Sequence, residues 1–444
     1  MTGVTADLAR WIARGDDPPT PRARRATVQA MLDWTGVTIA GASDPLVDLL
    51  IADASAQTGP GQHPIIGTRT YLPSDAAARI MGAASHALDF DDINKRMRGH
   101  PTVVILPAIL AALEDHSGAA TVDALVTGTE IACVLGEMMG EPHYAQGFHT
   151  TATVGTVAAA AGVCRLMGAS TEDTARALAL AATQASGLRA VFGTMAKPLH
   201  AGLAAEAGFR AARWAMQGMT APMDGIEAAQ GFGPVLSESF RPIAIRADRL
   251  APFGVEENVF KRHAACYYTH SAIDAAKSLA GEDMLQPNDI RSVHIGLQPG
   301  LHSVCDIVGP TTGLEVKFSV RHLVAMAILD RDTTDPHAYD ADLARDPDLV
   351  TLSGRIDVEP LETENRMEAS IRILRRSGEP LERRLDVSQP AQDLDQQEDA
   401  LVEKFTQLAR PVLGHRTDDL ATRILALDTD APLATLLADL MPET

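Results

Sequence analysis

Residues 154–167 read VGTVAAAAGVCRLM, and this stretch decides the kind of fold that the chain adopts. Small and apolar side chains fill it without a proline, and alanine is the strongest helix former. Thr121–Gly136 and Thr171–Ala185 have similar compositions, and Ser170 supplies an N-cap for the latter. The pattern predicts a mainly α protein in which helices pack closely through small side chains.

The pattern changes after about residue 268. Ile290–Leu297 (IRSVHIGL) alternates as a half-buried strand does. Ile356–Leu361 and Met367–Val387 also look like strands, whereas Leu314–Leu329 looks like a helix. Helical patterns return at about residue 396. We therefore predict a large all-helical domain formed by residues 1–267 and 396–444, and a smaller α+β domain inserted at residues 268–395.

Charge and cysteine content limit the partners and the compartment. The chain has 444 residues, with 38 Lys and Arg against 58 Asp and Glu, and its net charge is −20. Such a chain repels nucleic acid and anionic membrane surfaces, so we expect neither as a partner. Its four cysteines form no C-x-x-C pair, and Met1–Pro18 lacks the pattern of a signal peptide, which predicts a cytoplasmic protein.

Several familiar catalytic patterns are absent from the sequence. There is no H-E-x-x-H zinc motif, no G-x-G-x-x-G after a strand, no Walker A motif and no G-x-S-x-G elbow. These absences weigh against nicotinamide, nucleotide and serine-hydrolase enzymes. Candidate chemistry must therefore come from the histidines, lysines and carboxylates.

The first candidate cluster is HALDFDD at residues 86–92, followed by Arg98-Gly-His100-Pro. Proline favours an extended backbone at His100, at the start of the apolar run that begins at Val103. Asp89 and the two aspartates after it add carboxylates to this cluster. The alternative is a solvated loop in which Asp91 and Asp92 only cap or turn the chain.

Two further clusters lie beside predicted helices. His149 precedes a small-residue helix whose dipole favours the neutral imidazole that a general base requires. The alternative is a core histidine that the backbone satisfies. Lys197 precedes Pro198, and we predict that it lies just outside the helix Leu199–Gln217. A lysine beside a helix N-terminus makes an anion site.

The fourth cluster, KRHAACYYTH, covers residues 261–270. A zinc site made by His263, Cys266 and His270 lacks a fourth ligand at a suitable spacing. Together, the four clusters favour a cationic pocket for a small anionic carboxylate. Cations there would stabilise the enolate-like state that forms when an α-proton leaves. A non-catalytic binding protein is the alternative, and such a protein has no need to concentrate cations at apolar junctions.

The ordered motifs HALDFDD with GHP, GFHTT, GTMAKPLHAG, KRHAACYYTHSAIDA and EVKFSVRHLVAMAILD resemble the MmgE/PrpD family. They span His86 to Asp330. The resemblance implies an all-helical domain with an α+β lid, a homodimer, and no metal or organic cofactor. Members of this family include 2-methylcitrate dehydratase, iminodisuccinate epimerase and cis-aconitate decarboxylase.

The resemblance also implies the site. The catalytic candidates are His100, His149, Lys197, Lys261 and Tyr144, and the substrate-binding candidates are Asp89, Arg98, His200, Cys266 and His322. Decarboxylases of the family have a histidine at the position of Cys266 and a tyrosine at that of His322, which counts against decarboxylation here. Arg98 and Tyr144 lie in stretches similar to the epimerase.

The favoured interpretation is therefore a dehydratase of a small di- or tricarboxylate, and an epimerase of an N-substituted aspartate is a nearly equal alternative. In the dehydratase, His149 or His100 removes the α-proton. Lys197, Lys261 and Arg98 then bind the substrate carboxylates. In the epimerase, Tyr144 would return the proton on the opposite face.

Overall fold

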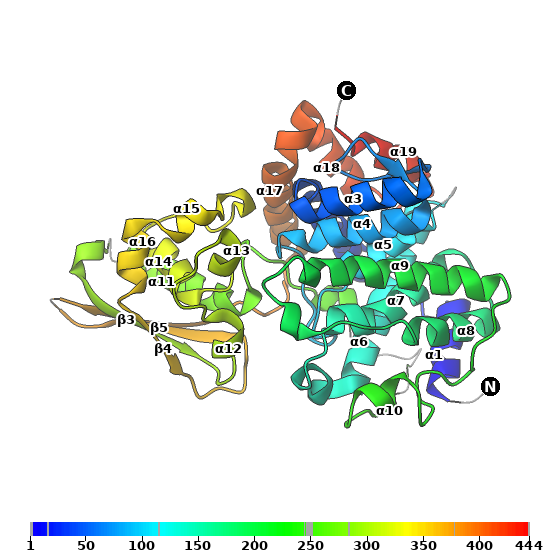
Figure 1. Cartoon of the computed structure of the whole chain (residues 1–444), viewed down its shortest axis with the longest axis horizontal. Coiled ribbons are helices and arrows are strands. Elements are labelled where there is room, and N and C mark those ends of the chain that lie inside the picture. Colours follow the sequence, from blue (N-terminus) through cyan, green and yellow to red (C-terminus); the bar gives the residue numbers. More distant parts are fainter. Residues whose placement is uncertain are drawn as a thin grey trace. The chain divides into compact units, whose positions relative to one another are not determined.

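The computed structural model describes residues 3–15, 17–113, 116–243, 245, 252–282, 285–376 and 378–442 (Figure 1). The chain divides into two compact units. The helical unit comprises Met1–Ala87, Asp91–Phe260 and Pro390–Thr444, and the α+β unit comprises Leu88–Phe90 and Lys261–Gln389. The prediction of a mainly α chain with a smaller α+β part is confirmed.

The helical unit contains helices from both ends of the chain. Its α-helices are α1 (Val4–Arg14), α2 (Pro21–Gly41), α3 (Pro45–Thr58), α4 (Ser74–Ala87), α5 (Thr102–Ala111), α6 (Gly118–Ala145), α7 (Thr150–Leu166), α8 (Thr171–Ala182), α9 (Ala196–Met216), α10 (Phe232–Leu236), α17 (Leu394–Leu413), α18 (Thr417–Leu425) and α19 (Ala434–Asp439). Its 3-10 turns are η1 (Arg189–Val191), η2 (Gly254–Glu257) and η6 (Gly414–Arg416), and β1 (His63–Pro64) pairs antiparallel with β2 (Tyr71–Leu72).

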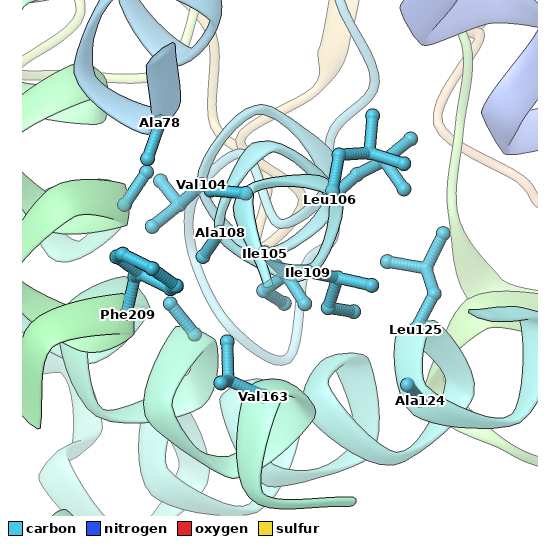
Figure 2. Packing of buried hydrophobic residues seen from close by; sticks show 14 of the residues in the cluster. Ala78, Val104, Ile105, Leu106, Ala108, Ile109, Ala124, Leu125, Val163 and Phe209 are labelled. Carbon is cyan, nitrogen blue, oxygen red and sulfur yellow. The ribbon is translucent and has the colours of Figure 1, made fainter. Parts of the chain in front are cut away.

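Small side chains let the central helices approach closely. Helix α7 packs against α5, α6, α8 and α9. A Cβ added at Gly208 of α9 would lie 2.5 Å from the Cβ of Ala159 in α7, so only glycine fits at this crossing. Figure 2 shows the apolar side chains of α5, among them Val104 and Ile109, packed with Phe209 and Val163. The helices of this core carry the candidate catalytic residues His149 and Lys197.

Helix α6 is the longest helix and the most apolar of the long ones. Its length and composition would suffice to cross a membrane, but 83% of its apolar window is buried inside the structure, as in a core helix. Gly140 interrupts it with φ 66° and ψ −174°, a conformation that favours glycine. The bend redirects the last turn, which carries His143 and Tyr144.

The α+β unit is built on a four-stranded sheet with the order β4-β3-β5-β6. Strand β3 pairs parallel with β4 and antiparallel with β5, and β5 pairs antiparallel with β6. Helix α11 packs on β5 and β6. The elements are η3 (Tyr267–Thr269), α11 (His270–Glu282), η4 (Pro287–Asp289), β3 (Ile290–Leu297), α12 (His302–Cys305), α13 (Gly313–Val316), α14 (Val320–Ile328), η5 (Pro336–Ala338), α15 (Ala341–Ala344), α16 (Pro347–Ser353), β4 (Ile356–Pro360), β5 (Glu368–Arg375) and β6 (Leu381–Asp386).

Two helix predictions need correction. The predicted helix Leu314–Leu329 is broken, because α13 ends at Val316 and Ser319 caps a new helix, α14. The Ser319 hydroxyl also donates to the carbonyl of Ile307, which fixes the break. Lys197 lies inside α9, which begins at Ala196, rather than before it. Pro198 is tolerated there because N–H groups of a first helical turn have no intrahelical acceptor.

Candidate active site

A buried carboxylate lies between two histidines in the helical unit. The Nδ1 atom of His86, at the end of α4, lies 2.9 Å from Oδ1 of Asp91. The Nδ1 atom of His100 lies 2.8 Å from Oδ2 of Asp91 and 2.9 Å from the carbonyl oxygen of Asp92. Because only acceptors face these two Nδ1 atoms, both carry protons, and the tautomer that this geometry selects has its lone pair on Nε2.

Burial sets the protonation of this group. Burial lowers the pKa of His86 to about 4, although Asp91 opposes the shift. Burial alone would raise the pKa of Asp91, but His86 and His100 hold it well below its ordinary value. The centroids of the two imidazole rings are 4.6 Å apart. At neutral pH the group is therefore one ionised carboxylate that orients a neutral His86 beside His100.

His149 lies at the start of α7, next to this group. Its ring is buried and stacks on His86 with the centroids 6.1 Å apart. Its Nδ1 atom is 3.2 Å from Nδ1 of His200, so one of the two donates to the other. Burial, followed by the charges of His86 and Lys197, lowers the pKa of His149 well below its ordinary value. Among the described residues, Nε2 of His149 has no hydrogen-bond partner.

The loop that carries His100 is fixed to the same helix as His149. The His100 N–H donates to Oγ1 of Thr151 at 3.1 Å, and the Thr150 hydroxyl donates to the Arg98 carbonyl. A Cβ at Gly99 would lie 2.9 Å from both the N and Oγ1 atoms of Thr151. The orientation of His100 relative to His149 is therefore set by contacts between the backbone of this loop and Thr150 and Thr151 at the start of α7.

Two candidate cations of the helical unit, Lys197 and Arg98, have different neighbours. Lys197 is only 7% exposed, and its Nζ lies 5.4 Å from the centroid of the Phe192 ring. The Phe192 ring also meets the edge of His149, with the centroids 5.0 Å apart. The Arg98 side chain, by contrast, contacts the carboxylate of Glu141 and donates to the carbonyl of Gly136.

Tyr144 is buried under an arginine that the sequence did not single out. The Cζ atom of Arg189 lies 3.9 Å from the centroid of the Tyr144 ring, and its Nη1 donates to the Tyr144 carbonyl at 3.0 Å. His86, Asp91, Phe192 and Arg189 thus lie in the site, although none of them is among the catalytic or substrate-binding candidates named from the sequence. His86 and Asp91 lie within the HALDFDD motif, so their spacing was available as a signal, whereas Arg189 and Phe192 lie outside every cluster.

The remaining candidates lie in the α+β unit. Lys261 is 1% exposed, and its Nζ lies 2.7 Å from Oδ1 of Asp89 and 2.6 Å from the Asp89 carbonyl. Asp89 has φ 52°, a left-handed backbone that this double contact holds. Cys266 is buried, and its N–H donates to the Lys317 carbonyl at 2.9 Å. His322 is buried in α14, and its burial lowers its pKa.

The geometry of His263 counts against the zinc alternative. Its Nδ1 lies 2.7 Å from the Thr333 hydroxyl and its Nε2 lies 2.9 Å from Oδ1 of Asp274. Both ring nitrogens are therefore hydrogen-bonded to oxygen atoms, and neither is available to a metal ion. His270 packs edge-on against His263, with the centroids 4.9 Å apart. These residues form a buried polar network within the α+β unit.

Comparison with known proteins places the chain among relatives of one enzyme type. It is 28% identical to cis-aconitate decarboxylase of Homo sapiens over 301 residues, which are 65% of this chain and 62% of that protein. It is 26% identical to cis-aconitate decarboxylase of Aspergillus terreus over 363 residues, 74% of this chain and 72% of that protein. The match to the Mus musculus enzyme is 27% over 301 residues, 65% of this chain and 61% of that protein. The human and mouse matches thus span less than two thirds of those proteins.

Family models match most of the chain. The MmgE/PrpD N-terminal domain matches residues 6–243, and the MmgE/PrpD C-terminal domain matches residues 263–429. The first match covers the segment that contributes His86, Asp91, His100, His149 and Lys197, and the second covers most of the α+β unit. The chain belongs to the MmgE/PrpD family.

Proposed function

We propose that the chain is a lyase that removes a proton beside a carboxylate of a small di- or tricarboxylate, and that the reaction is the dehydration of a hydroxy acid such as 2-methylcitrate. The observation that carries this proposal is the carboxylate of Asp91 between His86 and His100. It fixes the tautomer of His100 and leaves its Nε2 as a base. The carboxylate also stabilises the imidazolium that forms when this base accepts a proton.

In the proposed reaction, residues of the helical unit take up the α-proton, stabilise the added negative charge and return the proton to the leaving hydroxyl. The Nε2 atom of His100 takes the proton from the carbon next to a carboxylate, and that carboxylate becomes an enolate-like dianion. The buried ammonium of Lys197 stabilises the added charge. The dianion then expels the β-hydroxyl as the His100 imidazolium returns its proton to it, so that water leaves and an alkene forms. His149, neutral at physiological pH, is the alternative base.

Decarboxylation of cis-aconitate is the second candidate, and the names of the curated relatives favour it. In that reaction carbon dioxide leaves first and a protonated group then delivers a proton to the carbon. A histidine held by Asp91 could serve this step too. Cys266 and His322 count against this candidate, since the family resemblance places a histidine and a tyrosine at these positions in decarboxylases.

Proton NMR in deuterated water separates the candidates. The enzyme is incubated separately with 2-methylcitrate, citrate, cis-aconitate and iminodisuccinate. A new olefinic signal from a hydroxy acid supports the dehydratase, and loss of carbon dioxide from cis-aconitate supports the decarboxylase. Deuterium entering iminodisuccinate with inversion would instead show the epimerase.

A pair of variants links the signal to the site. His100→Gln should abolish the reaction, whereas His294→Gln should retain it, because His294 pairs with Glu359 on the sheet of the other unit. Equal activity of the two variants would contradict the proposed role of His100. No change in any substrate with wild-type enzyme would overturn the proposal.

A further inference from the structure

Arg189 is tied by its backbone to the loop that ends at His149. The Arg189 N–H donates to the Gly147 carbonyl at 2.8 Å, and the His149 N–H donates to the Gly187 carbonyl at 3.0 Å. Gly187 has φ 145°, and a Cβ there would lie 2.7 Å from the Cβ of Ala152 and 3.3 Å from Nδ1 of His200. The segment that begins at Gly187 is therefore pressed against the start of α7, and the position of Arg189 relative to His149 is fixed.

The Arg189 guanidinium lies against aromatic faces rather than against an acid. Its Cζ is 3.9 Å from the Tyr144 ring centroid and 6.0 Å from that of Phe192. Within the part of the chain that the structure describes, the Arg189 side chain contacts these two rings and the Tyr144 carbonyl rather than a carboxylate, and its buried Nε has no hydrogen-bond partner. A guanidinium stacked on a ring keeps its in-plane N–H groups for hydrogen bonds, and in Arg189 one N–H of Nη1 is used by the Tyr144 carbonyl while the other N–H groups of the fork remain for a carboxylate.

The Phe192 ring is shared by two cations and one candidate base. Its centroid is 5.4 Å from Nζ of Lys197, 6.0 Å from Cζ of Arg189 and 5.0 Å from the centroid of His149. A substrate with one carboxylate needs only one of these cations. Two cationic side chains beside the Phe192 ring are complementary in charge to a short molecule that carries carboxylates at two of its carbons.

We infer that Arg189 binds a second carboxylate of the substrate, while Lys197 binds the carboxylate next to the carbon that loses its proton. This inference rests on the proposed function and narrows it, because it requires a substrate with at least two carboxylates. The inference also means that Arg189, which lies outside the motifs GFHTT and GTMAKPLHAG, selects substrates that carry a second carboxylate. The fork of Arg189 selects a planar carboxylate, and an amide at the same position of the substrate would leave two donors facing each other.

Binding of an inert tricarboxylate tests this role without turnover. Isothermal titration calorimetry with propane-1,2,3-tricarboxylate, and with its terminal monoamide, is carried out on wild type, Arg189→Met and Arg189→Lys. Arg213→Met is the matched control, since Arg213 also lies over a ring, with its Cζ 5.4 Å from the Phe209 centroid, but lies in the last turn of α9. Thermal unfolding by circular dichroism checks that each variant is folded.

Arg189→Met should raise Kd for the tricarboxylate by about 30-fold or more, the loss expected for a charge-assisted double hydrogen bond. Arg189→Lys should raise it by about 3- to 10-fold, because the charge remains and the fork is lost. The preference of wild type for the tricarboxylate over the monoamide should fall to within about threefold in Arg189→Met, and Arg213→Met should bind as wild type does.

Two results would overturn the inference in distinguishable ways. If wild type turns over a polycarboxylate but Arg189→Met binds the tricarboxylate as tightly as wild type, the role of Arg189 fails and the proposed function stands. If Arg189→Met loses affinity for the acid and the monoamide by the same factor, Arg189 only supports the loop, and its role in specificity fails. If wild type neither binds nor turns over any polycarboxylate, both proposals fall together.

Discussion

Replacing Asp91 by asparagine tests the central claim about the site. The substitution keeps the size of the side chain but removes the charge between His86 and His100. Its amide could also donate to an imidazole Nδ1, which would move the ring proton to Nε2 and remove the base. We therefore expect kcat to fall while the affinity for an inert tricarboxylate changes little, because the binding cations remain.

The magnitude follows from the distance between the charges. At 2.8 Å, the Asp91 carboxylate and a His100 imidazolium attract each other by about 6 kcal/mol at an effective dielectric constant of about 20. The substrate and solvent rearrangement offset part of this attraction. A loss of about half, or ~3 kcal/mol in the transition state, lowers kcat by about a hundredfold. Wrong-tautomer substitutions in other enzymes cost up to about 10⁴-fold.

The assay is the initial rate of substrate loss by proton NMR, with the Kd of propane-1,2,3-tricarboxylate measured alongside. Asp92→Asn is the matched control, since burial raises the pKa of Asp92 to about 8 and so favours its neutral form at pH 7. We expect it to lose less than about tenfold. If Asp91→Asn kept kcat within threefold of wild type, or if both variants lost equally, the proposed role of the Asp91 charge would be refuted.

Three further predictions concern packing, pH and a buried ion pair. Gly99→Ala should lower kcat by about tenfold or more with little change in Kd, because its Cβ would displace Thr151; unchanged kinetics would contradict this. The free energy of unfolding in urea should fall by about 3 kcal/mol as pH drops from 6.5 to 4, because the folded pKa of His86 is below its unfolded value, and this dependence should weaken in His86→Gln. Lys404→Met should cost about 3–5 kcal/mol of that free energy by leaving Asp33 buried without the ammonium 2.7 Å away, and a loss below 1 kcal/mol would argue against this.

The elements that sequence patterns predicted well are those whose burial repeats locally. Ile290–Leu297 became β3 because the buried Val293, Ile295 and Leu297 alternate with the less buried Ser292 and His294, and this alternation depends only on the two faces of the strand. The break between α13 and α14 could not be predicted in this way. It depends on the contact between Ser319 and the carbonyl of Ile307, twelve residues earlier, and an apolar pattern carries no information about such a contact.

The candidate site shows the same division. The sequence predicts His100, His149 and Lys197 as site residues. In the structure the His100 and His149 rings both contact the His86 ring, and the Phe192 ring contacts both His149 and Lys197. Arg189 was not predicted, because a single arginine in a loop is usually solvated. Two features distinguish Arg189 in the structure: its contact with Tyr144, 45 residues earlier, and contacts with aromatic rings rather than with a carboxylate. Neither feature can be recognised from the sequence around it.

The two consecutive aspartates show why protonation states cannot be predicted from a motif. Asp91 and Asp92 are both buried, yet the pKa of Asp91 is lowered and that of Asp92 is raised to about 8. Asp91 faces two imidazoles, whereas Asp92 accepts from the hydroxyl of Thr102 and the amide of Asn258, neither of which carries a charge. Hydrogen bonds from these uncharged donors do not offset the free-energy cost of burying an ionised carboxylate, whereas the interactions of Asp91 with the two histidines do. One residue of offset in the loop therefore separates an ionised carboxylate that orients the base from a neutral one that anchors the loop.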